Sequence, residues 1–455
     1  MTTVAIVGGG ITGLTAAFYL QRQNVPVTVY ESAAQPGGAI QTTIRDGFLV
    51  EHGPNTILES APEVSALVDD LGLNSRRLYP APGSKARYLV RDGAMIRLPQ
   101  SALGGVRTPL LSLRAKLRIL AEPFIAKGRV PDEALADFVK RRLGTEVLDY
   151  CIDPFVGGVY AGNPERLSVA HGFPKLHALE QTYGSLIKGT ILGARARRKR
   201  GSRSKTSSPM LSFDAGLGVL IETLAQKLGD SVQLQSLITH MERDGAGWTA
   251  RTSAGERRKH SAVLLCAPAW RVAAMNIERV QQPDLARLRH VYYPPIARVA
   301  VAFPRNRIAH ALDGFGVLIP SKEKMHSLGI LFSSSLFPNR APEGYAVLTS
   351  FLGGSRWPGV LDTTDKGLVE IAIADMRKLL GVSGSPVFED VLRVPFAIPQ
   401  YNIGYGEVKT ALGNIEAQAP GVFVSSSFRN GISVADCIVS GKTAAEKLVQ
   451  YAGHA

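Results

Sequence analysis

Residues 4–13 read VAIVGGGITG, an apolar run that leads directly into a glycine-rich turn. The run predicts a buried strand, and the glycine spacing is that of a dinucleotide-binding turn. The first glycine permits the tight bend, the second lets the backbone approach a pyrophosphate, and the third allows close packing of the next helix. We therefore expect the following residues to contact a dinucleotide: Gly8, Gly9, Gly10, Ile11, Thr12 and Gly13.

A second strand is predicted at residues 27–31, one helix further along the chain, and it ends on Glu31. An acid at this position accepts hydrogen bonds from the ribose of a bound dinucleotide. Glu31 and the adjacent Ser32 are therefore candidate cofactor ligands. The succession of strand, turn, helix, strand and acid indicates dinucleotide binding more strongly than the glycines alone.

Three later segments are expected to lie beside the same ligand. A tight turn at residues 35–39 contains Gly38 and Ala39, and a short strand at 48–50 runs toward residues 53–56, namely Gly53, Pro54, Asn55 and Thr56. Near the C-terminus, a buried strand at 421–425 is followed by Asn430-Gly431-Ile432-Ser433, which leads into the last helix. Contacts spread so widely along the chain favour FAD, which is a long ligand. A flavin would carry the chemistry itself, so we expect no catalytic side chain.

Length and composition describe a multidomain globular protein. The 455 residues predict two or three domains, and 45% hydrophobic with 20% charged residues is ordinary for such a chain. No run approaches the roughly 18 apolar residues of a membrane-spanning helix. Because the first strand begins at residue 4, we expect no secretory signal or transit peptide before it, and we expect a cytoplasmic protein. The three cysteines are far apart, which predicts reduced thiols and no metal site.

The net charge of +14 is concentrated in two regions. Residues 76–118 carry ten basic side chains against one acid, and residues 188–205 carry eight against none. Such regions attract anionic lipid or a polycarboxylate substrate, although a solvated, mobile loop explains the second one equally well. Nucleic acid is not an expected partner, because no nucleic-acid-binding module accompanies the charge.

The hydrophobic pattern changes twice along the chain. Residues 62–205 are mostly helical in pattern, and strand-like segments return at residues 232–241, 248–252 and 262–266, where they resemble the missing part of a dinucleotide fold. A second sheet is predicted from residues 298–303, 316–319, 329–332 and 346–351. We assign this sheet to a substrate domain.

With these segments in place, the chain resembles the oxygen-dependent protoporphyrinogen oxidases, within the amine oxidase and phytoene desaturase type of flavoproteins. The resemblance covers nearly the whole chain. Its general motifs are the first glycine turn, the Glu31 strand and residues 53–56. Its more specific motifs are residues 87–93, 153–164, 314–323, 331–334 and 337–342.

The resemblance implies an activity and a set of site residues. The activity is removal of six hydrogens from protoporphyrinogen IX to give protoporphyrin IX, while oxygen reoxidises FAD and yields hydrogen peroxide. Arg87 would pair with a propionate, and Leu318, Leu331 and Phe351 would hold the flat tetrapyrrole. Gly157 and Gly158 would shape the substrate cavity. Ile238 would lie at the adenine, and Ile432, Ser433 and Val434, with Gly431 and Ser427, at the flavin end.

The predicted fold is an α/β protein with a discontinuous Rossmann-like FAD-binding domain, a mixed-sheet substrate domain and a helical insertion. The FAD-binding domain comprises residues 1–75, 206–285 and 405–455, the substrate domain residues 76–89 and 286–404, and the insertion residues 90–205. The resemblance implies that the insertion associates with the surface of a membrane, and a homodimer is left open.

Two positions depart from the family pattern. Many relatives carry an Ala-Gly-Asn or Ala-Gly-Asp turn near the flavin, where this chain has Ser425-Ser426-Ser427. Gly38-Ala39 replaces a glycine and a basic residue. A serine hydroxyl still donates and accepts hydrogen bonds, so we expect FAD binding to survive.

Three alternatives stay open at this point. The nearest is oxidation of coproporphyrinogen III, a substrate with four propionates, to coproporphyrin III. The second is another flavin oxidase that acts on an amine or a carotenoid. The third is a non-catalytic binding protein with the same fold, similar to the dissociation inhibitors of prenylated GTPases.

Overall fold

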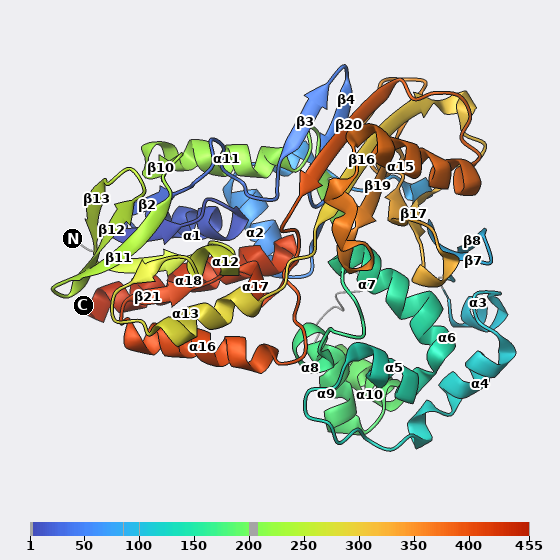
Figure 1. Ribbon diagram of the computed structural model, residues 1–455, viewed down its shortest axis with the longest axis horizontal. Helices are drawn as coiled ribbons and strands as arrows, with labels where there is room; N and C mark the ends of the chain where they lie inside the picture. The colour runs from blue at the N-terminus through green and yellow to red at the C-terminus, as the bar shows by residue number, and fades with distance from the viewer. Residues whose placement is uncertain (1–2, 85, 100, 200–207, 455) are drawn as a thin grey trace.

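The first strand, β1 (Val4–Val7), lies at the centre of a five-stranded parallel sheet. The computed structural model describes residues 3–84, 86–99, 101–199 and 208–454, so part of the basic segment 188–205 lies outside the described residues. The strands of the parallel sheet follow the order β10 (Val232–Gln233), β2 (Val27–Tyr30), β1, β14 (Ala262–Leu265) and β21 (Val422–Val424). Three distant parts of the chain therefore build one sheet (Figure 1).

Alternate residues of β1 pack into two different cores, one on each face of the parallel sheet. Val4 and Ile6 belong to a core formed with helices on one face, and Ala5 and Val7 belong to a core on the other face. The first core contains α1 (Ile11–Arg22), α2 (Pro62–Asp70), α11 (Gly218–Leu228) and α18 (Val434–His454). The second contains α12 (Ala269–Val272), α13 (Gln282–Arg287), α16 (Tyr405–Gln418) and a small sheet. The result is a three-layer arrangement, visible on the left of Figure 1.

The small sheet corrects one predicted strand. Residues 232–241 are expected as a single strand, but the structure divides them between β10 in the parallel sheet and β11 (Ile238–Asp244) in a different sheet. Gln235 has a φ of +53°, which turns the chain between the two strands. The sheet has the order β13 (Arg257–His260), β12 (Gly247–Thr252), β11 and β15 (Asn276–Ile277).

His260 of β13 gives this region a dependence on pH. The side chain is buried, and its Nε2 lies 2.9 Å from the Tyr30 hydroxyl. Burial, assisted by the charge of Arg258, lowers the pKa of His260 to about 4. Between pH 6.5 and 4 the unfolded chain therefore binds a proton that the folded chain excludes, so stability falls as the pH falls through this window.

We expect the loss attributable to His260 to reach about 3 kcal/mol at pH 4. The check is urea unfolding of the wild-type protein and of His260→Phe at pH 7, 5.5 and 4. The variant should lose less stability on acidification than the wild type, even if it is less stable at pH 7. Equal pH dependence in the two proteins would contradict the prediction.

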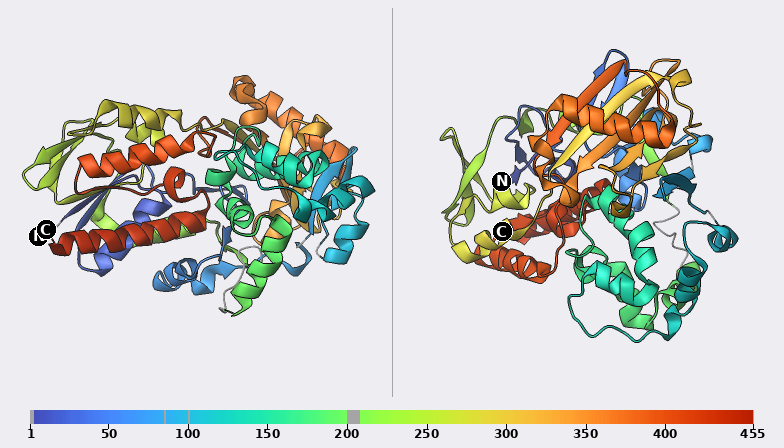
Figure 2. Two further views of the ribbon diagram at one scale, coloured as in Figure 1. Left: turned by 90° about the horizontal axis from the view of Figure 1, so that it is seen from below. Right: turned by 45° about the vertical axis from the view of Figure 1, so that its right-hand side comes forward.

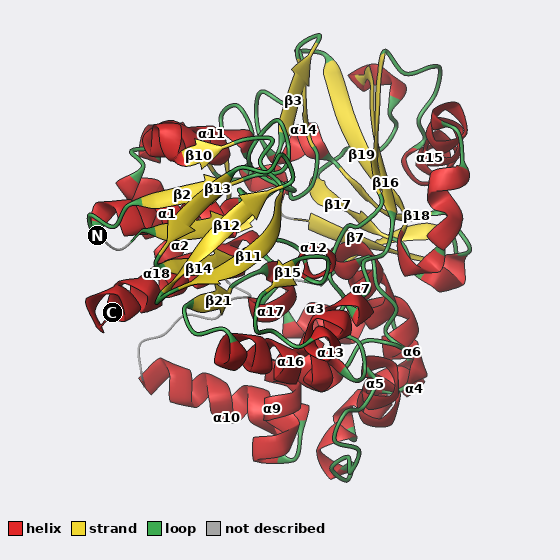
Figure 3. Ribbon diagram, turned by 60° about the vertical axis from the view of Figure 1, so that its left-hand side comes forward, coloured by secondary structure: helices red, strands yellow, loops and turns green. Residues whose placement is uncertain are grey.

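A seven-stranded mixed sheet forms the second large unit. Its order is β20 (Phe388–Val394), β16 (Ile296–Pro304), β19 (Tyr345–Gly353), β18 (Ser327–Leu331), β17 (Gly314–Leu318), β7 (Ala86–Arg91) and β8 (Ala94–Arg97). Helix α15 (Asp365–Leu380) packs on one face of this sheet through a buried apolar core (Figure 3). The opposite face is partly covered by β4 (Phe48–Glu51), which forms a hairpin with β3 (Thr42–Arg45).

Short elements connect these units. A three-stranded sheet has the order β5 (Ile57–Leu58), β9 (Met210–Phe213) and β6 (Arg77–Leu78). Helix α14 (Ser333–Leu336) follows β18, and α17 (Ser427–Asn430) follows β21. The strand β9 thus leads the chain back from the helical region toward α11.

The helical region occupies the lower right of Figure 1 and the bottom of the right-hand view in Figure 2. It contains α3 (Ala102–Arg107), α4 (Leu113–Leu120), α5 (Leu135–Leu143), α6 (Thr145–Val147), α7 (Asp153–Tyr160), α8 (Val169–Gly172), α9 (Pro174–Tyr183) and α10 (Leu186–Lys199), with a π-helical turn at Leu148–Ile152. Inside it, the buried Arg142 guanidinium pairs with Glu122 at 3.0 Å and with Glu180 at 2.5 Å. In the part of the chain that the structure describes, no helix is both long and apolar enough to cross a membrane.

The predicted limit at residue 90 falls inside β7. The hairpin of β7 and β8 continues to Arg97 as the edge of the seven-stranded sheet, and the helices begin only at Ala102. Asp92 and Gly93, both with positive φ, make the turn of this hairpin. The other domain limits stay predictions.

Candidate cofactor and substrate site

The glycine turn joins β1 to α1 by close backbone contact. Gly8 has a φ of +112° and donates its N–H to the Tyr30 carbonyl at 2.9 Å. A Cβ on Gly13 would lie 2.1 Å from the Gly8 carbonyl oxygen, so the helix packs against the turn with no room for a side chain. A Cβ on Gly10 would meet nothing within 4 Å, which leaves open space beside the start of α1.

The Glu31 carboxylate lies at the carboxyl end of β2 and faces this turn. Its Oε2 accepts the Gly9 N–H at 2.8 Å, and its Oε1 accepts the Ala33 N–H at 2.8 Å and the Ser32 hydroxyl at 3.3 Å. These bonds hold a largely buried carboxylate in a fixed orientation at the end of the strand. A carboxylate oxygen has two lone pairs, so acceptor capacity remains for a ribose hydroxyl.

The second and third predicted cofactor segments contact the first. The Gly37 N–H donates to the Gly9 carbonyl at 2.7 Å, and a Cβ on Gly38 would lie 3.6 Å from the Gly10 Cα. A Cβ on Gly53 would lie 2.4 Å from the Ala39 carbonyl oxygen, so Gly53 packs closely against this turn. The structure therefore brings the three segments together at one end of the parallel sheet.

Ile238 lies on the far side of Glu31. The Ser236 N–H donates to the Glu31 carbonyl at 2.8 Å, which places the start of β11 alongside residues 31–33. Ile238 itself is buried and belongs to the core that contains Tyr30 and Val7.

The C-terminal segment reaches the same edge of the sheet through α17 and α18. Gly431 has a φ of +123° between these helices, and the Ser433 hydroxyl accepts the Asp436 N–H at 3.1 Å at the start of α18. Helix α18 packs closely on α1, because a Cβ on Gly441 would lie 2.5 Å from the Thr12 carbonyl oxygen. The predicted flavin end is thus held next to the predicted phosphate-binding helix.

These residues fit a dinucleotide. Open space lies at Gly10, the N-terminus of α1 favours a phosphate, and Glu31 provides an acceptor for a ribose. All three features lie at the carboxyl ends of parallel strands, where ligands of doubly wound folds bind.

The predicted substrate residues lie on one face of the seven-stranded sheet. Leu318 is opposite Gly329, and Gly329 is opposite Phe351, so these three positions form a row across β17, β18 and β19. Leu331 is opposite Thr349, two residues before Phe351, and therefore shares this face. Arg87 of β7 is opposite Gly316, which is opposite Leu331, and it also shares the face.

Exposure distinguishes these side chains from their neighbours. From Ala346 to Gly353 every residue of β19 is buried except Phe351, and in β18 every residue is buried except Leu331. Arg87 is the exposed member of the first five residues of β7. The three half-buried apolar side chains and the arginine thus share one face, and their chemistry suits a flat apolar ligand with a carboxylate. We refer to this set, Arg87, Leu318, Leu331 and Phe351, as the substrate face.

Helix α7 lies against the substrate face. A Cβ on Gly158 would lie 2.3 Å from Leu318 Cδ2, and a Cβ on Gly157 would lie 2.8 Å from Arg356 Nη2. Arg356 pairs with Asp153 at the start of the same helix, at 2.9 Å. The two glycines therefore allow α7 to approach the sheet, which is a packing role beside the predicted cavity.

The structure adds site residues that the sequence pattern does not identify. Phe155 and Val159 of α7 are exposed, and Phe155 lies three residues before Gly158, on the same side of the helix. Tyr401 and Tyr405 are buried and donate hydrogen bonds to the backbone of α17. The position of these two tyrosines around the start of α16 is a weak sequence signal, because their hydrogen-bond partners lie more than twenty residues further along the chain.

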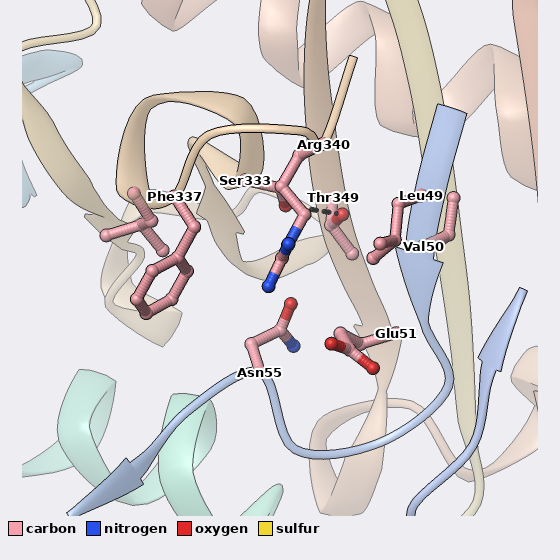
Figure 4. Close-up of a pocket in the computed structure, with 9 residues that line it drawn as sticks. Leu49, Val50, Glu51, Asn55, Ser333, Phe337, Arg340 and Thr349 are labelled. Carbon is pink, nitrogen blue, oxygen red and sulfur yellow. Dashed lines mark hydrogen bonds between the residues drawn. The ribbon is translucent and has the colours of Figure 1, made fainter. Parts of the chain in front are cut away.

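A small pocket lies beside Asn55 of the third cofactor segment (Figure 4). The Arg340 side chain points into it toward Glu51 and Asn55, and its Nη2 donates to the Ser212 hydroxyl at 2.8 Å. Burial raises the pKa of Glu51, whose carboxylate accepts the Thr42 hydroxyl at 2.6 Å. The pocket is lined by Leu49, Val50, Glu51, Asn55, Ser333, Leu336, Phe337, Arg340 and Thr349. The charged side chains of Arg340 and Glu51 thus lie beside Asn55 of the third cofactor segment.

Comparison with known proteins identifies the family. Residues 11–449 match the family described as flavin containing amine oxidoreductase. The chain belongs to this family. The predicted flavin cofactor, FAD, is thereby confirmed, and so is the prediction of an oxidoreductase.

Individual relatives cover almost the whole chain. Protoporphyrinogen oxidase 2 of Arabidopsis thaliana is 35% identical, with 98% of this chain and 94% of the relative covered. Coproporphyrinogen III oxidase of Bacillus subtilis is 28% identical, with 98% of each chain covered. The crystal structure of a protein from Exiguobacterium sp. 255-15 has a TM-score of 0.82 at 24% identity and 98% coverage of both chains, which confirms the fold. The predicted resemblance to protoporphyrinogen oxidases is confirmed.

Proposed function

We propose that this protein oxidises protoporphyrinogen IX to protoporphyrin IX, with oxygen as the electron acceptor and hydrogen peroxide as the second product. The observation that carries the proposal is the substrate face, on which one exposed guanidinium adjoins three half-buried apolar side chains. An arginine offers a planar fork of donors to a carboxylate, and apolar walls suit a flat macrocycle. The 35%-identical protoporphyrinogen oxidase supports the same substrate.

Bound FAD would accept a hydride from the macrocycle and pass the electrons to oxygen. In this proposal, Gly8 to Gly13, Glu31, Ser32, Gly38, Ala39, residues 53–56, Ile238, Ser427 and residues 431–434 hold it. Arg87 binds a propionate and so fixes the rotation of the macrocycle. Leu318, Leu331 and Phe351 exclude water from one side of the substrate, and α7 closes the other side.

The charges around the substrate face favour a substrate with few carboxylates. Arg91 and Arg298 share this face with Arg87, but Arg91 pairs with Glu146 at 2.6 Å and Arg298 pairs with Asp390 at 2.6 Å. Within the described ranges, Arg87 forms no ion pair with an acid. One available guanidinium suits the propionate edge of protoporphyrinogen better than the four propionates of coproporphyrinogen.

Oxidation of coproporphyrinogen III is the second candidate, because the Bacillus subtilis relative with that name also aligns over 98% of the chain. Parallel turnover of the two porphyrinogens, each followed by porphyrin fluorescence, separates the candidates. Our proposal expects the higher kcat/KM with protoporphyrinogen IX. A higher kcat/KM with coproporphyrinogen III would assign the second function instead.

We further propose that the helical region binds the surface of an anionic membrane, on the cytoplasmic face. Leu113, Leu117 and Leu120 of α4 are 72%, 58% and 68% exposed, and Phe124 is 87% exposed one turn later. The exposed Arg114, Lys127 and Arg129 flank this stripe. Such a helix inserts its apolar face among lipid headgroups without spanning the bilayer. Co-sedimentation with phosphatidylserine vesicles should be lost in Leu117→Glu/Phe124→Glu, and unchanged sedimentation would contradict the proposal.

A further inference from the structure

A buried tyrosine replaces a backbone hydrogen bond at the predicted flavin end. Helix α17 is a single turn, and in a longer helix the Gly431 N–H would bond the Ser427 carbonyl. Here the Tyr401 hydroxyl lies between these two groups. It accepts the Gly431 N–H at 3.0 Å and donates to the Ser427 carbonyl at 2.5 Å. The hydroxyl therefore ends α17 and lets the chain leave the helical path at Gly431.

A second tyrosine supports the same turn. The Tyr405 hydroxyl donates to the carbonyl of Phe428, the residue after Ser427. The rings of Tyr401 and Tyr405 pack edge to face with centroids 4.8 Å apart, and both side chains are buried. Two successive carbonyls of α17 thus have side-chain donors from one short segment.

The same segment also forms hydrogen bonds on the substrate side of the site. The Gln400 side-chain amide donates to the Tyr160 carbonyl at the end of α7, at 2.7 Å. The Ser168 N–H donates to the Tyr401 carbonyl at 2.9 Å. Residues 400–405 therefore connect α7, which contacts the substrate face through Gly158, with the turn that precedes α18.

We propose that Tyr401 is a positioning residue for the flavin. Its hydroxyl fixes the peptide groups of Gly431 to Val434 relative to α7, and so sets the distance between bound flavin and substrate. The effect on the distance to the substrate rests on the proposed function. The effect on the flavin requires only that FAD binds. The segment Ser425-Ser426-Ser427, which departs from the family pattern, ends at this turn. The Tyr401 hydroxyl donates a hydrogen bond to the carbonyl of its last residue, Ser427.

The test is Tyr401→Phe, which removes the hydroxyl and keeps the ring. The dissociation constant of FAD from the apoprotein should rise about tenfold, because one buried hydrogen bond to each of two backbone groups is lost. The visible absorption spectrum and the midpoint potential of the bound flavin should shift. With porphyrinogen, kcat should fall about tenfold while KM changes less than twofold.

Tyr88→Phe is the matched control, because the buried Tyr88 hydroxyl donates to Asp313 at 2.6 Å on the opposite face of the seven-stranded sheet. It should lower thermal stability without changing the flavin spectrum or potential. Tyr405→Phe provides a second variant if Tyr401→Phe does not fold, and it should shift the spectrum in the same direction. If Tyr401→Phe and Tyr405→Phe had the FAD affinity, flavin spectrum and midpoint potential of the wild type, the inference would be overturned. Because these three readouts use FAD alone, they are independent of the porphyrinogen that the enzyme oxidises.

Discussion

Replacing Gly13 by alanine is expected to abolish stable FAD binding. The new Cβ would lie 2.1 Å from the Gly8 carbonyl oxygen, a backbone atom that no side-chain rotation can move. Helix α1 must therefore shift away from the turn that holds Glu31 and the open space at Gly10. We expect a loss of at least about 3 kcal/mol in stability and a fall of at least about 100-fold in FAD affinity. The purified variant should be colourless where the wild type is yellow.

Gly413→Ala is the control for this change. Gly413 lies in α16, and a Cβ there would meet nothing within 4 Å. The control should retain flavin and gain about 0.5–1 kcal/mol, because alanine favours a helix over glycine. If Gly13→Ala kept wild-type flavin content, the close approach of α1 to the turn would not be a requirement for binding.

Replacing Arg87 by alanine is expected to weaken the substrate complex selectively. A charge-assisted hydrogen bond contributes about 1.5–3 kcal/mol, so kcat/KM for protoporphyrinogen IX should fall about 10- to 100-fold. The effect should lie mainly in KM, because a propionate is remote from the carbon that loses hydride. The flavin spectrum should stay unchanged.

Arg97→Ala tests whether any lost positive charge would have the same effect. Arg97 is opposite Tyr88 and therefore lies on the other face of the sheet, where it is exposed and 4.0 Å from Asp313. Steady-state kinetics should show near wild-type kcat/KM for this control. Equal losses in both variants would assign the effect to general electrostatics, and no loss in Arg87→Ala would remove the propionate assignment.

Local sequence signals predict the part of the site that short-range geometry determines. The need for glycine at position 13 follows from a backbone contact within one strand, its turn and the next helix, and this contact with the Gly8 carbonyl is present. Glu31 directly follows its strand, which ends at Tyr30, one residue earlier than expected, and its carboxylate faces the turn. The apolar strands of the second sheet also appear where their alternation predicts them.

The structure divides one strand that the hydrophobic pattern predicts as continuous. Residues 232–241 are divided between two sheets because Gln235 adopts a positive φ, and glutamine gives no warning of this conformation. The Asp92-Gly93 pair is a stronger signal, because an Asp-Gly dipeptide is typical of the tight turn of a hairpin, and the structure has such a hairpin between β7 and β8.

Contacts between distant segments are the remaining part that sequence reasoning does not reach. The Tyr401 hydroxyl bonds to α17 and the Arg340 guanidinium bonds to Ser212, which lies 128 residues away. No periodicity or spacing links such partners, because they meet only after the sheets have assembled. The same holds for Arg298 and Asp390, whose pairing leaves Arg87 as the available guanidinium among the three arginines of this face.

The most direct measurement of the proposed function is an aerobic assay of the flavin-loaded protein with protoporphyrinogen IX, in which porphyrin fluorescence and hydrogen peroxide are recorded together. Removal of six hydrogens in two-electron steps should yield three molecules of peroxide for each protoporphyrin formed. Arg87→Ala should lower both signals in parallel. A yellow, flavin-loaded protein that forms neither protoporphyrin nor peroxide would contradict the proposed activity.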